Sequence, residues 1–199
     1  MKVLVINGSY SKDGATAALV RNYLTGMASK TRGMKVKTAD LRDMKFKFCD
    51  GCAACMQNDG KRLGECHLQD AMNDFLPAML EADQIVCASP VYFFSLTAVM
   101  MKYLERCAPL MYEGPRGPVP RTKPTPGKKG VILLSTDVPY PWNIVLGHTR
   151  AAKKALSLLC AAAGCSKVLS LSAGAMDSGT SVKEKFLRKA HALGVAAAE

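Results

Sequence analysis

The sequence predicts an α/β fold in which a parallel β-sheet carries helices on both faces. Short runs rich in β-branched residues alternate along the chain with segments whose apolar residues recur at helical spacing. Strands that alternate with helices pair in parallel, because each helix provides a right-handed crossover between neighbouring strands. Hydrophobic residues make up 49% of the chain, which is enough to bury such a sheet.

The first half of the chain holds three predicted strands, at residues 2–6, 34–41 and 84–88. Helices are expected where apolar residues recur at helical spacing, around residues 19–27, 72–80 and 96–107. In the second of these helices, Pro77 must kink the helix or delay its start toward Asp74, because proline has no backbone N–H. The segment at 42–69 between these elements is expected to be a cysteine-rich loop.

The second half of the chain begins with residues 113–129, which are rich in Pro, Gly and basic residues and predict a loop without secondary structure. Two further strands are expected, at residues 131–135 and 167–171. Between them an alanine-rich helix should end near Gly164. A final helix should open at the capping box formed by Ser181 and Glu184.

The length of 199 residues suits one domain, and no change in composition marks a boundary, so we expect a single domain over residues 1–199. No apolar stretch approaches the roughly 18 residues that predict a membrane span. The apolar run before Asn7 is shorter than the roughly 7 to 15 residues of a secretory signal. We therefore expect a cytoplasmic protein without a membrane partner, whose eight cysteines are reduced.

The chain has a formal net charge of +11, from 27 Lys and Arg against 16 Asp and Glu. The basic residues are scattered, and no motif typical of nucleic-acid recognition accompanies them, so a nucleic-acid partner is not expected. A positive field of this size attracts anions. The phosphates of a nicotinamide nucleotide or an acidic electron-carrier protein would fit it.

The loop after the first strand has the composition of an anion-binding site. Gly8 and Gly14 allow the backbone to approach a ligand, and the hydroxyls of Ser9, Ser11 and Thr16 can donate to it. The helix that follows adds free N–H groups and a favourable dipole. The P-loop lysine and the dinucleotide fingerprint are both missing, so a single terminal phosphate fits best. The alternative is an ordinary turn in which Ser and Thr cap the helix.

Consecutive aromatic residues follow the third strand in Ser-Pro-Val-Tyr-Phe-Phe-Ser, residues 89–95. They fall at the carboxyl edge of the sheet, where open α/β sheets bind ligands. A flat isoalloxazine ring would cover them, and a dimer interface is the alternative. The loop after the fourth strand, which begins with Thr136 and Asp137, would form a third wall. Trp142 in that loop could instead fill the core.

Four cysteines, Cys49, Cys52, Cys55 and Cys66, lie in the cysteine-rich loop. The first three have the C-x2-C-x2-C spacing by which ferredoxins bind iron–sulfur clusters. The fourth is farther along the chain, and His67 follows it where those ferredoxins have proline. A cluster is the leading interpretation, with free thiols, zinc or a disulfide pair as alternatives.

Three motifs occur in one order: GSxxxxGxT, then C-x2-C-x2-C with a later Cys, then ADxIVxxSPVYFFSLTAxMxxYLER. In this order the chain resembles the NADPH-dependent FMN reductase-like branch of the flavodoxin superfamily, and within it the iron-sulfur flavoproteins. The resemblance implies a flavodoxin-like three-layer fold with five parallel strands in the order 2-1-3-4-5. It also implies that FMN binds at the switch between the first and third strands.

The resemblance carries site residues onto this chain. It places the FMN phosphate at Ser9, Ser11, Gly14, Ala15 and Thr16, and the isoalloxazine at Pro90, Val91, Tyr92 and Phe93. By their position, Thr136 and Asp137 are expected to complete the cofactor site. A 4Fe-4S cluster would be ligated by Cys49, Cys52, Cys55 and Cys66. No catalytic side chain is expected, because the flavin carries the chemistry.

Three functions remain open. An iron-sulfur flavoprotein would pass electrons between a cluster and FMN, with a ferredoxin-like carrier as partner. An NAD(P)H-dependent oxidoreductase would reduce a quinone, a flavin or another small-molecule acceptor, with the cysteines incidental. The third is a non-catalytic flavin-binding protein. The exposed aromatic residues also predict a homodimer or homotetramer.

Overall fold

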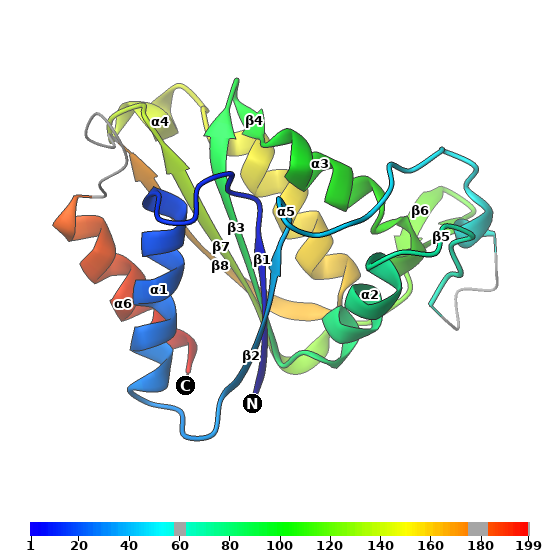
Figure 1. The fold of residues 1–199 in the computed structure, drawn as a ribbon, viewed down its shortest axis with the longest axis horizontal. Helices are drawn as coiled ribbons and strands as arrows, with labels where there is room; N and C mark the ends of the chain where they lie inside the picture. Colours follow the sequence, from blue (N-terminus) through cyan, green and yellow to red (C-terminus); the bar gives the residue numbers. More distant parts are fainter. Residues whose placement is uncertain (58–62, 175–182, 199) are drawn as a thin grey trace.

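The computed structural model describes residues 1–57, 63–174 and 183–198. Its central sheet has the strand order β2-β1-β3-β7-β8, and all neighbouring pairs on this path are parallel (Figure 1). The strands are β1 (Lys2–Asn7), β2 (Lys35–Asp40), β3 (Gln84–Tyr92), β7 (Thr125–Thr136) and β8 (Cys165–Gly174). This order confirms the predicted arrangement, in which the second strand lies at one edge and the order of strand addition across the sheet reverses between β1 and β3.

Helices cover both faces of the sheet (Figure 1). One face carries α1 (Ala15–Ala28) and α6 (Glu184–Ala197), and the other carries α2 (Met72–Glu81), α3 (Ala98–Glu105) and α5 (Arg150–Ala162). Alternate residues of a strand point to opposite faces, which divides the core in two. Val3 and Val5 of β1 pack on the α1 and α6 side, while Leu4 and Ile6 pack on the other.

The backbones of α1 and α6 are in close contact. A Cβ atom at Gly26 would overlap the carbonyl oxygen of His191, and one at Gly194 would overlap that of Tyr23. Glycine at both positions therefore lets the two helices approach more closely than any side chain would allow. This contact fixes α1, whose first turn borders the candidate ligand site.

The prediction of an unstructured loop over residues 113–129 is wrong. A short antiparallel ribbon, β5 (Met111–Gly114) and β6 (Gly117–Pro120), occupies its first part, and β7 already begins at Thr125. Prolines are tolerated in this ribbon because they occupy strands with only one neighbour. The third strand is also longer than predicted, and its end pairs with the short β4 (Ser95–Leu96).

The helices differ from the prediction mainly at their ends. Pro77 lies inside α2, which begins at Met72, so of the two predicted effects the delayed start toward Asp74 is excluded. A short helix α4 (Trp142–Val145) and two 3-10 turns, η1 (Ala54–Met56) and η2 (Ala108–Leu110), were not predicted. The final helix begins at Glu184 with Lys183 at its N-cap, and Ser181 of the predicted capping box lies outside the described residues. In the part of the chain that the structure describes, no helix is long and apolar enough to cross a membrane.

Candidate functional site

A cleft of about 630 Å³ opens at the carboxyl ends of β3 and β7. It is lined by Tyr10, Val91, Tyr92, Phe93, Ser95, Leu96, Thr97, Ala98, Thr136, Asp137, Val138 and His148. The cleft lies beside the point where the sheet reverses its strand order, as expected for a ligand site in an open α/β sheet. Its aromatic rim comes from the loop between β3 and β4.

This aromatic loop has an unusual backbone. Phe93 and Phe94 have φ angles of +48° and +61°, in the left-handed region that bulky residues rarely adopt. Both lie in the two-residue turn between β3 and β4, where tight hairpins require positive φ. The turn leaves the Phe93 side chain 100% exposed. An apolar ring held in the solvent by a strained turn is typical of a surface that binds a ligand or a partner.

The loop after β1 is shaped by hydrogen bonds among its own residues. The backbone N–H of Ser9 donates to Asn7 Oδ1 at 3.1 Å, and the N–H of Ser11 donates to Ser9 Oγ at 3.2 Å. At its start, Thr97 Oγ1 donates to the carbonyl oxygen of Gly8 at 2.8 Å. A side chain at Gly8 would collide with Met100 and Thr97, so glycine allows the loop to lie directly on α3.

The first turn of α1 offers an uncapped N-terminus. Gly14 is the N-cap, and within the described part of the chain no side chain caps the helix and no acidic residue lies in its first turn. The first intrahelical bond runs from the N–H of Ala18 to the carbonyl of Gly14. The N–H groups of Ala15, Thr16 and Ala17 therefore remain available for an anion. This turn fits a phosphate group.

The structure brings most of the predicted cofactor residues to one edge of the sheet. Val91, Tyr92, Phe93, Thr136 and Asp137 line the cleft itself. Pro90 lies in β3, paired with Ser135 and buried. The first loop, with Ser9, Ser11, Gly14, Ala15 and Thr16, adjoins this edge, because Thr16 Oγ1 hydrogen-bonds to Ser135 Oγ at 2.8 Å. Ser135 immediately precedes the cleft residue Thr136.

Several cleft residues were not among the predicted site residues, among them Tyr10, Thr97 and His148. Thr97 was detectable from the sequence, since a threonine directly before a helical pattern is a candidate N-cap. In the structure it is the N-cap of α3 and accepts a hydrogen bond from the N–H of Met100. His148 reaches the cleft through a contact that no spacing reveals: its Nδ1 lies 3.0 Å from Thr136 Oγ1. Trp142, expected as part of the third wall or as core filling, is 57% exposed and does not line the cleft.

The cysteine-rich loop is fastened to the C-terminal end of α3 by Arg106. This arginine is 2% exposed, and its Nη1 donates to Asp70 Oδ2 at 2.6 Å and to the carbonyl of Lys47 at 2.9 Å. Its Nη2 donates to Asp70 Oδ1 at 3.2 Å and lies 3.8 Å from Cys66 Sγ. One buried guanidinium thus hydrogen-bonds to the segment before the cysteines, at Lys47, and to the segment after them, at Asp70. The several N–H donors of arginine allow this.

Hydrogen bonds to Asp70 also set its protonation. Burial alone would raise the pKa of this carboxyl, but the Arg106 guanidinium and the backbone N–H groups of Lys47 and Met72 outweigh burial and hold the pKa below its usual range. Asp70 is therefore a carboxylate at neutral pH. The pair is a buried, bidentate ion pair in which both charges are compensated.

The four cysteines of the loop share one neighbourhood. Cys55 is buried, Cys49 and Cys66 are half-buried, and Cys52 is exposed. Burial raises the pKa of the Cys55 thiol, and the other three thiols raise it further in the order Cys66, Cys49 and Cys52. Thiols that are close enough to interact in this way, next to a guanidinium that compensates negative charge, fit the donor set of an iron–sulfur cluster. The remaining cysteines, Cys87, Cys107, Cys160 and Cys165, are buried in the core.

The strand order and the cleft at its reversal define a flavodoxin-like α/β protein. Two solved structures share this fold over nearly their whole length. An NAD(P)H:quinone oxidoreductase from Methanothermobacter marburgensis is 18% identical with a TM-score of 0.73, covering 98% of this chain and 94% of that one. An FMN-dependent NADH-azoreductase from Bacillus anthracis, solved in complex with FMN, is 14% identical with a TM-score of 0.70, covering 99% and 97%.

Residues 1–136 match the NADPH-dependent FMN reductase family, and the chain belongs to that family. Curated relatives include an iron-sulfur flavoprotein of Methanocaldococcus jannaschii, 36% identical over 110 residues, which are 55% of this chain and 53% of the relative. An iron-sulfur flavoprotein of Methanosarcina thermophila is 27% identical over 106 residues, 53% of this chain and 52% of the relative. The chain thus spans about half the length of the curated relatives it matches.

Proposed function

We propose that this protein is an FMN-dependent oxidoreductase of the iron-sulfur flavoprotein type. The observation that carries the proposal is the junction of two features at one sheet edge. An uncapped helix N-terminus suited to a phosphate adjoins a cleft with an aromatic rim suited to a flat ring. FMN has these two chemical parts, and its isoalloxazine supplies the redox chemistry when bound.

Each part of the site has a distinct task in this proposal. The N–H groups of Ala15 and Thr16, with the hydroxyls of Ser9, Ser11 and Thr16, hold the phosphate beside Gly14. Pro90, Val91, Tyr92 and Phe93 pack along the ring, and Thr136 and Asp137 close its other side. His148, held by Thr136, fills the wall behind and excludes water. These residues position the cofactor and take no covalent part in the reaction.

The cysteine-rich loop would hold a 4Fe-4S cluster through Cys49, Cys52, Cys55 and Cys66. Its donors are thiols in one neighbourhood, and the Arg106 guanidinium lies 3.8 Å from Cys66 Sγ to compensate negative charge. The names of the curated relatives support this assignment. Cys52→Ser should remove iron and leave FMN in place, since the phosphate loop and the cysteine loop are separate. Cys160→Ser, a change in the core, is the control that should keep both cofactors.

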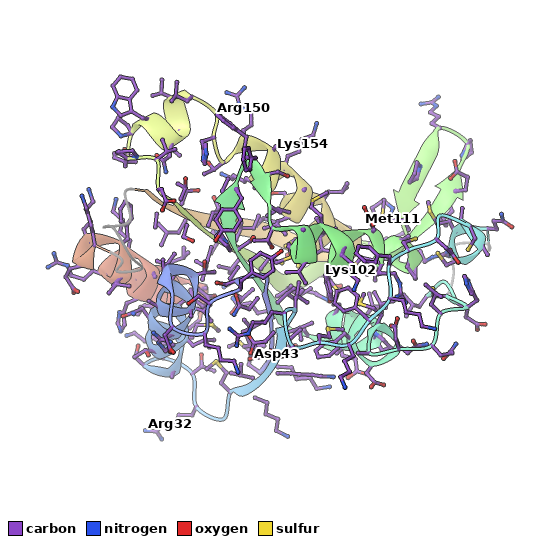
Figure 2. The ribbon with its side chains drawn as sticks, turned by 45° about the horizontal axis from the view of Figure 1, so that its top comes forward. Arg32, Asp43, Lys102, Met111, Arg150 and Lys154 are labelled. Atoms are coloured by element: carbon purple, nitrogen blue, oxygen red, sulfur yellow. The ribbon has the colours of Figure 1, made fainter. Side chains whose placement is uncertain are left out.

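The electron donor is proposed to be anionic, either NADPH or an acidic ferredoxin-like carrier. The charge of +11 favours such partners, and Arg150 and Lys154 on α5 lie at the same end of the molecule as β4 (Figure 2). The acceptor would be a second carrier or a small molecule that enters the cleft. We place the protein in the cytoplasm as one domain over residues 1–199.

Reduction of bound flavin under anaerobic conditions tests the function. Protein purified without oxygen and loaded with FMN is mixed separately with NADPH, NADH and reduced ferredoxin, and the visible absorbance of the flavin is followed. We expect at least one donor to bleach the flavin absorbance at a rate fast enough for catalysis. The same protein should contain about four irons per chain. Flavin reduced by NADPH in protein without iron would instead make it an NAD(P)H-dependent reductase. Bound flavin that no donor reduces would point to a non-catalytic flavin-binding protein.

A homodimer or homotetramer is proposed from the apolar side chains near the cleft. In the aromatic loop and in residues 140–146, which include α4, the apolar side chains that are more than half exposed are Phe93, Phe94, Tyr140, Trp142, Ile144, Val145 and Leu146. A second copy that covers them would also close the cleft. Light scattering should give at least twice the monomer mass, and Phe93→Ser should lower it. A monomer at all concentrations would contradict this part of the proposal.

A further inference from the structure

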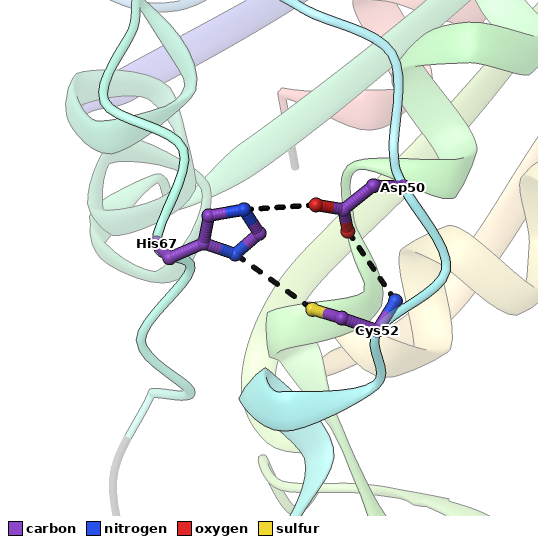
Figure 3. A group of neighbouring side chains, drawn as sticks. All are labelled: Asp50, Cys52 and His67. Carbon is purple, nitrogen blue, oxygen red and sulfur yellow. Dashed lines mark hydrogen bonds and ion pairs between the residues drawn. The ribbon is translucent and has the colours of Figure 1, made fainter.

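Arg106 and His67 each place a side-chain nitrogen beside a thiol of the cysteine-rich loop, in different surroundings. Arg106 Nη2 is 3.8 Å from Cys66 Sγ, and the arginine side chain is 1% exposed. His67 Nδ1 is 3.7 Å from Cys52 Sγ, but the histidine side chain is 54% exposed and its Nε2 lies 2.8 Å from Asp50 Oδ2 at the surface (Figure 3). Buried charges are screened much less than exposed ones, so Arg106 has the stronger electrostatic effect on the thiols.

Asp70 fixes the position of the Arg106 guanidinium. Its Oδ2 accepts from Nη1 at 2.6 Å, and its Oδ1 accepts from Nη2 at 3.2 Å. The same two oxygens accept the backbone N–H groups of Lys47 at 2.9 Å and of Met72 at 3.0 Å, so the carboxylate is itself anchored. Nη2 carries two N–H groups, which lets it serve Asp70 and Cys66 together. One positive and one negative charge are thus held in place beside a single thiol.

Charges in this position act on the redox behaviour of the thiols' proposed cofactor. The reduction potential of an iron–sulfur cluster depends on net charge and on hydrogen bonds to its sulfur atoms. Reduction by one electron from the donor adds one negative charge and breaks no bond in the protein. The guanidinium of Arg106 stabilises that added charge through its N–H toward Cys66, which raises the potential. The carboxylate of Asp70 repels the added charge, which lowers the potential.

We propose that Arg106 and Asp70 together set the reduction potential of the cluster through Cys66, with opposite signs. This inference rests on the proposed function, since the cysteines must hold a cluster for the pair to act on it. Both are positioning residues, because neither is among the proposed ligands and neither lines the flavin cleft. The role goes beyond bracing the loop, since a brace needs no particular charge beside a sulfur atom.

Redox titration of protein that contains both cofactors tests this role. The cluster is reconstituted anaerobically, iron and FMN contents are measured, and the EPR signal of the reduced cluster is followed against the applied potential. Arg106→Met should lower the equilibrium constant for one-electron reduction by about tenfold or more, equivalent to about 59 mV, since it removes the donor and leaves Asp70 uncompensated. Asp70→Asn should raise the constant by a similar factor, because the positive charge of Arg106 is then unopposed.

Arg106→Lys and His67→Gln are the matched comparisons. Lysine keeps the charge but lacks the planar fork that serves Asp70 and Cys66 together, so a smaller fall in potential is expected. His67→Gln changes the exposed neighbour of Cys52 and should leave the potential unchanged within error, because solvent and salt screen that position. The potential of the bound flavin, read in the same titration, should move much less than that of the cluster in every variant.

The direction of the shifts decides the outcome. Potentials that move the same way in Arg106→Met and Asp70→Asn, or that do not move, would overturn the proposal, because loosening of the loop acts alike in both. If Arg106→Met assembles no cluster, the fall in Arg106→Lys against the rise in Asp70→Asn decides. Loss of iron from all three variants, with FMN retained, would mean that the pair only braces the loop. Absence of stoichiometric iron in the parent would refute the proposed cluster, and this inference with it, and the iron assay reveals that before any potential is measured.

Discussion

Thr16 Oγ1 and Ser135 Oγ form a buried hydrogen bond of 2.8 Å between the first loop and the end of β7. A hydroxyl can donate one hydrogen bond and accept others. If Ser135 donates to Thr16, the Thr16 proton is directed toward the proposed phosphate. One hydrogen bond thus connects the first turn of α1, the proposed phosphate site, to the end of β7 beside the cleft.

Thr16→Val should weaken FMN binding by roughly ten- to a hundredfold, because a hydrogen bond to a charged group is worth about 1.5 to 3 kcal/mol. Ser135→Ala is the matched control. It removes the partner hydroxyl but leaves the phosphate donor, so the expected loss is smaller. Fluorescence titration of both apoproteins with FMN measures the two effects. Equal losses in the two variants would mean that Thr16 acts only through Ser135.

The ion pair between Arg106 and Asp70 is buried, with side chains 1% and 8% exposed. Arg106→Met should lower the free energy of unfolding by about 3 to 5 kcal/mol, because it leaves a buried carboxylate uncompensated. The double variant with Asp70→Asn should recover part of the loss, since no uncompensated charge remains. Urea denaturation at neutral pH measures both. A double variant as unstable as Arg106→Met would show that packing alone is lost.

Asp70 also predicts a dependence of stability on acid. Its pKa is lowered in the folded protein, so its contribution is fully present above the unfolded value of about 3.9. The contribution is lost as the pH falls through the lower, folded pKa, because the unfolded chain then binds more protons. Asp70→Asn should flatten the fall of the unfolding free energy below about pH 4. An acid profile unchanged by this variant would contradict the assignment.

At the scale of elements, the sequence predicted the five central strands from their β-branched and apolar residues, which are continuous in β1, β3 and β7 and interleaved with polar residues in β2 and β8. The β5 and β6 ribbon could not be predicted in the same way. Its residues mix Pro and Gly with a few apolar residues and show no regular alternation, and it is held by contacts distant in sequence, such as Arg121 Nη2 donating to the carbonyl of Cys55 at 2.9 Å. The short α4 was missed because only Trp142–Val145 is helical, less than two turns.

The contact between α1 and α6 gives a prediction at this scale. Gly194→Ala should lower the free energy of unfolding by about 1 to 3 kcal/mol, since its Cβ would overlap the carbonyl oxygen of Tyr23. Alanine is otherwise the better helix residue, by about 1 kcal/mol. A fall in the free energy of unfolding would therefore show that the helix contact outweighs helix propensity. A thermal or denaturant midpoint above that of the parent would show that the helices separate without cost.

For the molecule as a whole, α3 relates the two candidate centres. Thr97 at its N-cap bonds the phosphate loop at Gly8, and Arg106 at its C-cap bonds the cysteine-rich loop. The helix has eight residues, so the centres lie at opposite ends of a rod about 12 Å long. Both centres are thus attached to one helix, and no residue belongs to both.

The parts of the site that the sequence predicted are those held on contiguous segments, such as Val91, Tyr92 and Phe93. The order of the strands could also be predicted, because it follows from the resemblance and from alternation of strands and helices. Contacts such as Thr136 with His148 or Cys52 with His67 could not, since they depend on how loops distant in sequence fold against each other. The role of Arg106 was hidden for the same reason.

The central claim is that the uncapped turn of α1 holds the phosphate of a flavin seated in the adjoining cleft. Titration of the apoprotein with FMN and, in parallel, with riboflavin tests it most directly, because the two ligands differ only in the phosphate. We predict one FMN per chain and affinity for riboflavin lower by a hundredfold or more, roughly the loss of two hydrogen bonds to a charged group. Equal affinity for the two flavins, or no binding of FMN, would contradict the claim.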